Sequence, residues 1–423
     1  MTSPAPPGAG VVTVDQVHPR VTRQLALLLA AIVLGMSPWF SATVVARAMT
    51  AEWATDGDGA TLAVWLTLAV QLGFVVGSTI SATLLLADRW RPARLAAASA
   101  ALAASATALL AVPGVQGGNA VALRLVVGMA LAGVYPPGIK LAAGWTTTRR
   151  GTAIGALVGA TTLGSAVPHL LSLAVPESAW RRLVLVAAGC CLLGALLFAT
   201  VIREGPYQGR SAPFDPRALS RVVANRGVRL ATMGYLGHMW ELYAMWSTIG
   251  LFWQVVTSAR GSGPWLAPVM GFVSVGAGAL GCLLAGQWSD RIGRSRVTIV
   301  AMMLSGTCAL LIGPAMHAPL LLLGAISILW GVSVVADSAQ FSAVVTEFAA
   351  SDYVGTAVTV QTALGFLLTV VTIRLVPTWS GWWGWEWAYA PLALGPLAGV
   401  VAMARLLPME DERSRASRRG RAD

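Results

Sequence analysis

The sequence alternates long apolar stretches with short segments that carry arginine, glycine or proline. A membrane-spanning helix needs about 20 mostly apolar residues. Because 56% of the residues are hydrophobic and only 11% are charged, the chain matches a protein whose solvent is lipid and not a soluble enzyme. We predict an all-α membrane protein with twelve transmembrane helices, at 24–48, 61–86, 94–113, 119–145, 152–175, 182–202, 230–257, 265–287, 296–314, 319–346, 355–377 and 388–407.

The longest interior polar stretch separates six of these helices from the other six and contains three prolines. Arg150-Gly-Thr-Ala and Val354-Gly-Thr-Ala open equivalent helices of the two groups, 204 residues apart, as expected of a transporter built from structural repeats. The predicted organisation is a tail (1–22), a six-helix half (23–202), a linker (203–228), a second six-helix half (229–407) and a basic tail (408–423).

The basic residues indicate how the chain crosses the membrane. Of the 29 lysines and arginines, 22 fall in alternate segments on one side and 5 on the other. The positive-inside rule therefore predicts a multi-pass protein of the cytoplasmic (inner) membrane with both termini in the cytoplasm. The net charge of +11 reflects this topology and does not indicate nucleic acid. The four cysteines lie inside apolar stretches, so we expect neither disulfides nor a metal site, and no cofactor.

The loop after 265–287 contains Asp290, Arg291, Gly293 and Arg294, preceded by Gly286. It resembles the G-x-x-x-D-R-x-G-R loop motif of the major facilitator superfamily. The resemblance implies twelve helices in two pseudo-symmetric halves and secondary transport by alternating access. A carboxylate at a helix end can pair with a neighbouring helix N-terminus in one conformation only, which biases a two-state gate.

A second, weaker copy of the motif stands at the equivalent place in the first half, with Asp88 and Arg89 but with Leu84 and Arg91 in place of the glycines. The alternative is that both segments are ordinary positively charged cytoplasmic loops.

Two cations lie inside the predicted helix 119–145. Arg124 starts an Arg-x-x-x-Gly sequence that resembles a helix 4 motif of the superfamily, where the resemblance implies a part in proton coupling. Lys140 follows Tyr135 and two prolines that must interrupt the helix, and a broken helix beside a cation is a candidate anion site. Each cation has an alternative interpretation as a side chain that extends to the membrane surface.

Two acids, Glu241 and Asp337, lie deep in apolar stretches near the predicted membrane midplane. Intramembrane carboxylates are costly and usually functional, so they are candidate proton carriers or substrate ligands, although a structural role is the alternative. His238 precedes Glu241 by three residues and shares its helix face, which favours it over His169 as a proton relay. We therefore assign proton coupling to Glu241, Asp337, Arg124 and His238, and solute binding to Lys140, Tyr135, Trp240, Gln340 and Trp39.

We expect a monomeric, proton-coupled secondary transporter that moves a small polar or anionic solute by alternating access. The segments around Glu241 and Asp337 are similar to those of a bacterial subgroup near the nitrate/nitrite porters. Efflux of amphipathic drugs and copper uptake are alternatives on the same fold, and a polytopic membrane enzyme is a remote one. ATP hydrolysis is excluded, because Lys140 is the only lysine and follows no phosphate-binding loop.

Overall fold

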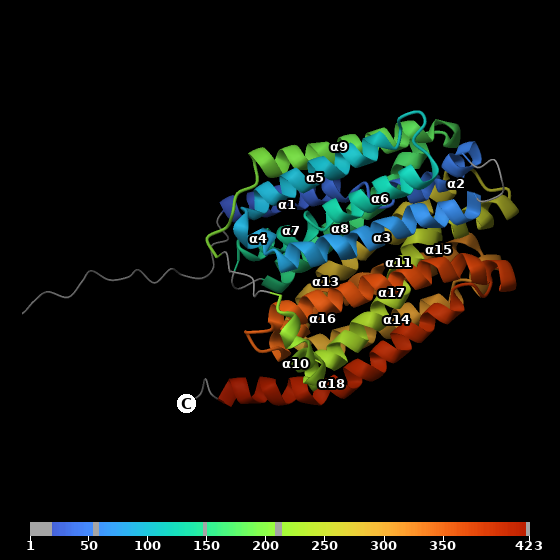
Figure 1. Ribbon diagram of the computed structural model, residues 1–423. Coiled ribbons are helices and arrows are strands. Elements are labelled where there is room, and N and C mark those ends of the chain that lie inside the picture. The colour runs from blue at the N-terminus through green and yellow to red at the C-terminus, as the bar shows by residue number, and fades with distance from the viewer. Residues whose placement is uncertain (1–18, 54–58, 147–149, 208–213, 420–423) are drawn as a thin grey trace, which may run out of the picture.

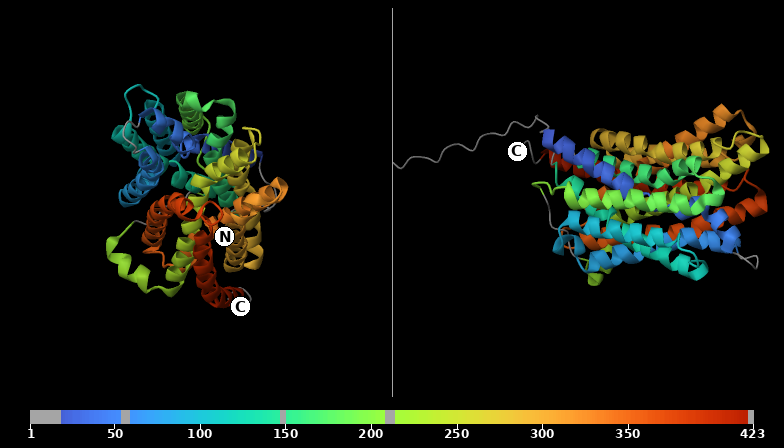
Figure 2. Two further views of the ribbon diagram at one scale, coloured as in Figure 1. Left: turned by 90° about the vertical axis from the view of Figure 1, so that its right-hand side faces the viewer. Right: turned by 90° about the horizontal axis from the view of Figure 1, so that it is seen from above.

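The computed structural model describes residues 19–53, 59–146, 150–207 and 214–419 (Figure 1). The described part of the chain is helical and contains no strand. Long helices run side by side and form two halves, the first from blue to green and the second from yellow to red (Figures 1 and 2). The predicted all-α class is thereby confirmed.

The first half has the following helices: α1 (Pro19–Met36), α2 (Ser41–Trp53), α3 (Gly59–Thr83), α4 (Leu86–Arg89), α5 (Pro92–Leu109), α6 (Gly117–Leu131), α7 (Tyr135–Ala143), α8 (Arg150–Ala174), the short η1 (Glu177–Ala179) and α9 (Trp180–Thr200). The linker contributes η2 (Pro216–Ala218) and α10 (Leu219–Ala224).

The second half contains α11 (Arg226–Ala259), α12 (Leu266–Gly276), α13 (Gly278–Ile292), α14 (Arg294–Leu311), η3 (Pro314–His317), α15 (Leu320–Ala336), α16 (Ser338–Phe348), α17 (Val354–Trp383), η4 (Ala390–Ala393) and α18 (Leu394–Arg419).

Within the described residues, ten helical segments are long and apolar enough to cross a membrane. Helices α5 and α11 lie beside these segments and complete the twelve passes that the sequence predicted. Helix α11 is one of the two that fall outside the ten, and it carries the buried polar residues His238 and Glu241.

Four of the predicted helices are each divided in two. The break between α1 and α2 contains Pro38, and Pro136 at the start of α7 lacks the N–H that would continue α6. The break between α15 and α16 falls at Asp337, 204 residues after Gly133 in the α6/α7 break. The broken helices thus follow the same repeat offset as the sequence.

Helix α18 continues to Arg419, beyond the predicted end at 407, so the described part of the predicted C-terminal tail is helical. The predicted N-terminal tail lies outside the described residues except for its last positions, which already belong to α1.

The two halves meet where α8 lies against α12 and α13, and where α3 lies against α17. Contact is closest along one glycine face of α8. A Cβ atom on Gly155 would lie 2.8 Å from the carbonyl oxygen of Cys282, and one on Gly159 would lie 3.1 Å from that of Ala279. Glycine therefore allows the backbones of opposite halves to touch.

Candidate functional site

A cavity of about 620 Å³ lies between the halves. It is lined by residues of α2, α3, α8, α11, α12 and α17, and it reaches Ala51 and Gly59 near the ends of α2 and α3. Much of the lining is apolar, and hydroxyl and amide groups are spread over it: Thr43, Thr50, Thr67, Ser172, Ser247, Thr248 and Gln254. This is the composition of a site for a small molecule with a few polar groups.

Arg47 and His169 are the ionisable side chains among the described residues that line this cavity. Arg47 stands one turn after Thr43 on α2 and is exposed. Sequence reasoning counted it only as a charge outside the membrane. Its position inside the predicted helix 24–48, in register with Thr43, was the signal available.

His169 extends from α8 into the opposite half. Methyl groups on Gly250 of α11 and Gly271 of α12 would lie 2.7 Å from its Cε1 and Nδ1 atoms, respectively. The two glycines therefore form a notch that holds the imidazole at the cavity wall, where sequence reasoning had favoured His238 instead.

Aromatic rings from both halves pack together beyond the inner end of the cavity. The ring of Trp39 lies 5.2 Å from Phe74, 5.7 Å from Tyr243 and 6.0 Å from Phe366, measured between centroids. Phe40 and Trp246 extend the group. We refer to these six residues as the aromatic cluster.

The cluster lies on one side of the cavity because of the direction in which each helix runs. On α2 and α11, cavity residues follow the aromatic residues in sequence, whereas on the antiparallel α3 the cavity residue Thr67 precedes Phe74. The cavity therefore occupies the end of the bundle near Ala51 and Gly59, and the cluster separates it from the end that carries Asp88 and Asp290.

Arg124 is fully buried and does not reach a membrane surface. Its Nε atom donates to the carbonyl oxygen of Leu66 at 3.0 Å, and its two terminal nitrogens donate to Pro38 at 2.8 Å and Trp39 at 2.5 Å. The carbonyls of Pro38 and Trp39 belong to the α1/α2 break, where the helical hydrogen-bond pattern is interrupted. Arg124 thus holds the segment that carries Trp39 in the aromatic cluster.

Lys140 lies at the opposite end from the cavity. Its Nζ atom is 2.5 Å from Oδ1 of Asp88 and 3.0 Å from the carbonyl oxygen of Ala87. The cation that the sequence assigned to solute binding therefore belongs to the first motif loop. Arg89, the next residue of that loop, is exposed.

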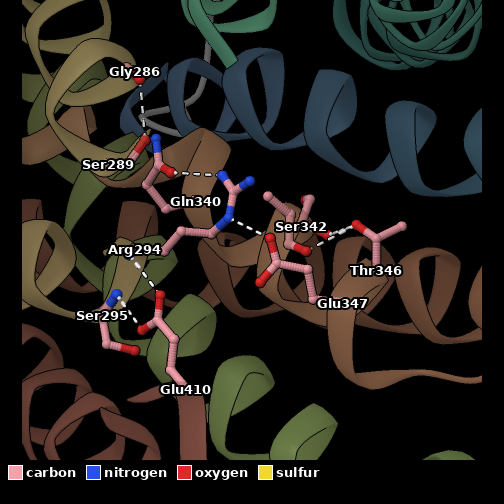
Figure 3. A network of polar contacts seen from close by, with 10 residues as sticks. Gly286, Ser289, Arg294, Ser295, Gln340, Ser342, Thr346, Glu347 and Glu410 are labelled. Atoms are coloured by element: carbon pink, nitrogen blue, oxygen red, sulfur yellow. Dashed lines mark hydrogen bonds and ion pairs between the residues drawn. The ribbon is translucent and has the colours of Figure 1, made fainter. Parts of the chain in front are cut away.

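The second motif loop is held by a network around Arg294 (Figure 3). Its side chain donates from Nε to Glu347 at 2.7 Å and from a terminal nitrogen to Gln340 at 3.1 Å. The backbone N–H groups of Arg294 and Ser295 donate to the carboxylate of Glu410 at 2.7 and 3.0 Å. Glu410, from α18, therefore caps the N-terminus of α14, where a negative charge is favoured.

Asp290 connects this loop to the other half. A Cβ on Gly151, in the first turn of α8, would lie 3.1 Å from its Oδ1 atom. The carboxylate thus lies beside the N-terminus of α8, where the helix dipole attracts it. Gly293 has φ +94°, which favours glycine, and begins the turn into α14. Arg291 is exposed.

The two deep acids lie inside the second half and do not line the cavity. The Glu241 carboxylate accepts hydrogen bonds from Trp330 Nε1 at 2.6 Å and Ser305 Oγ at 2.9 Å, which link α11 to α15 and α14. Asp337 Oδ1 lies 2.8 Å from His238 Nδ1, and both side chains are buried.

Comparison with known proteins decides the family. The model of the Major Facilitator Superfamily matches residues 27–373, which is most of the chain. The chain belongs to this superfamily. A solved structure titled human organic anion transporter MFSD10 (TETRAN) is similar with a TM-score of 0.65 and 15% identity, covering 91% of this chain and 100% of that one, which shows the fold. No curated protein matches the sequence.

The family resemblance given by the motif loops is thereby confirmed. This superfamily member is a multi-pass membrane protein and a secondary transporter of small-molecule solutes, and members of the superfamily are transporters rather than enzymes.

Five residues of this superfamily member were predicted to bind the solute, and none lines the cavity. Lys140 and Gln340 join the two motif-loop networks, and Trp39 belongs to the aromatic cluster. Tyr135 begins α7, and Trp240 lies in an apolar groove beside α17 and α18, where its Nε1 donates to the carbonyl of Pro391. Their roles in solute binding stay predictions.

Proposed function

We propose that this transporter moves a small organic anion through the cavity by alternating access, coupled to protons. The observation that carries the proposal is the charge of the cavity wall: Arg47 and His169 are its ionisable groups among the described residues, and the rest of the polar lining is neutral. A permanent positive charge in a largely apolar cavity attracts and orients an anion. Since residues of a single chain line this cavity, we propose that a monomer suffices.

The proposed conformation is outward-facing. The arginine distribution supports placing both termini and both motif loops in the cytoplasm, in the inner membrane. The cavity then opens away from the cytoplasm. The aromatic cluster, the Asp290 contact with α8 and the Gly155 contact with Cys282 close the cytoplasmic side.

In this proposal Glu241 and Asp337 carry protons and do not touch the solute. Both Glu241 oxygens accept hydrogen bonds, from different helices, so protonation of either oxygen alters a contact that joins α11 to α14 or α15. His238 provides a partner for Asp337 at the α15/α16 break. Proton binding is thereby linked to helix packing in the half that must move.

The name of the similar human structure mentions organic anions, but the argument here rests on this chain's own charges. Copper uptake has less support. The three methionines of α11 do not follow one path, because Met233 is exposed on the surface while Met239 and Met245 are buried.

The test is a thermal-shift screen of the detergent-purified protein with inorganic anions, organic anions and amines. A ligand at 100 times its Kd stabilises the folded state by about 2.7 kcal/mol. We expect organic anions to stabilise the wild type and to lose this effect in Arg47→Gln. Arg374→Gln is the matched control, because this exposed arginine belongs to α17 and does not line the cavity. Stabilisation by amines alone would reject an anionic solute.

A further inference from the structure

Three buried polar side chains lie beside the aromatic cluster with hydrogen-bonding atoms that find no partner in the described structure. They are the indole Nε1 of Trp39, the indole Nε1 of Trp246, and both amide atoms of Gln71. Trp39 is 2% exposed, Trp246 is 3% exposed and Gln71 is 0% exposed. Leaving such a group buried and unpaired costs about 1–3 kcal/mol each, so their presence requires an explanation.

Each of these residues is one helical turn from the cavity wall. Trp39 precedes Thr43 by four residues, and Trp246 precedes Gly250 by four. Gln71 follows Thr67 by four residues on α3, and Phe74 of the cluster comes three residues later. Residues at these spacings share a helix face. The unpaired groups therefore form a layer between the cavity and the centre of the cluster, with members from both halves.

This layer combines two kinds of recognition. The indole N–H groups and the amide NH₂ are hydrogen-bond donors suited to a carboxylate or another acceptor. The rings of Phe74, Tyr243 and Phe366 provide flat apolar faces, with centroids 4.4 Å apart for Phe74 and Phe366 and 5.2 Å apart for Tyr243 and Phe366. Such faces prefer to contact another ring.

We propose that Trp39, Trp246 and Gln71 form the deeper binding layer for the transported solute and that the solute is an aromatic carboxylate. This inference rests on the proposed function, since the anion must first enter the cavity at Arg47. The solute then moves one turn inward, its ring enters the aromatic cluster, and its carboxylate takes the hydrogen bonds that are unpaired in the present conformation. Arg124 keeps Trp39 in place through its backbone carbonyl.

The experiment measures the Kd of benzoate and of cyclohexanecarboxylate on the full-length purified protein by thermal-shift titration. We expect benzoate to bind at least fivefold more tightly than its saturated analogue. Trp39→Phe, Trp246→Phe and Gln71→Leu should each weaken benzoate binding at least fivefold. Their melting temperatures without ligand should be unchanged or higher, because each substitution removes an unpaired buried group.

Trp240→Phe is the matched control. It removes an indole N–H that is already bonded to Pro391, outside this layer, and should leave benzoate binding unchanged. A merely structural role for the three residues predicts a different result, namely lower melting temperatures together with weaker binding, and that result would overturn the inference.

The remaining outcomes separate this inference from the proposed function. Benzoate binding that depends on Arg47 but is normal in all three variants would overturn the deeper layer and leave an anion transporter. Equal binding of benzoate and cyclohexanecarboxylate would overturn the aromatic preference. Absence of binding by every anion in the wild type would reject the proposed function itself.

Discussion

Arg124 donates a hydrogen bond to the carbonyl oxygen of Trp39, so a buried charge of α6 holds the break between α1 and α2 in place. The same guanidinium bonds Pro38 and Leu66, and its three acceptors are backbone carbonyls. A planar group with donors on three nitrogens suits this arrangement. The arginine thus connects a helix break to the position of an aromatic ring between the halves.

Arg124→Lys should therefore lower stability and transport although it keeps the charge. An ammonium group cannot reach the three carbonyls with the same geometry, and each unpaired buried carbonyl costs about 1–3 kcal/mol. We expect a clearly lower melting temperature and at least a tenfold loss of transport. A melting curve identical to the wild type would show that the three hydrogen bonds contribute nothing.

Asp290→Asn should favour opening of the side that carries the motif loops. A carboxylate beside a helix N-terminus contributes roughly 0.3–1 kcal/mol, which changes a conformational equilibrium by up to about fivefold. Spin labels at positions 90 and 288, both exposed, report the distance between the halves at this end. We expect a larger population at long distance.

The control for that experiment is Asp352→Asn, which breaks an exposed ion pair with Arg221 within the second half and its linker. It should leave the distance distribution unchanged. Identical distributions in Asp290→Asn and the wild type would remove Asp290 from the gate.

Gly155→Val should prevent the halves from closing at the motif-loop end. Its Cβ would meet the carbonyl oxygen of Cys282 at 2.8 Å, and a backbone atom cannot move away without shifting α13. We expect transport to fall more than tenfold in a protein that still folds. Gly189→Ala, on α9 with open space around it, is the control and should transport normally. Normal transport by Gly155→Val would mean that this contact is not required.

Glu241→Gln should separate proton coupling from solute movement. The amide keeps the size of the side chain and one acceptor oxygen but cannot carry a proton, so uptake driven by a pH gradient should be lost while solute exchange without a gradient continues. Both rates are measured in proteoliposomes, with Ser305→Ala as a variant that removes one hydrogen bond and leaves the carboxylate. Unchanged accumulation in Glu241→Gln would eliminate this acid as a proton carrier.

The sequence by itself determined the class of structure. Apolar stretches of membrane-spanning length, the arginine-rich segments and the repeat of 204 residues depend only on local composition and spacing, and they predicted the twelve helices and two halves. The motif loops also indicated the family, because Asp290, Gly293 and Arg294 are close together in the chain.

Only the tertiary structure decided which charged side chains meet. Lys140 and Asp88 are 52 residues apart, and Arg294 and Glu410 are 116 apart, so no local pattern relates them. Arg47 and His169 line one cavity because α2 and α8 converge there, whereas Glu241 turns into its own half toward Ser305 and Trp330. The direction of a side chain depends on how whole helices rotate and pack against each other, and that information is distributed over the entire chain.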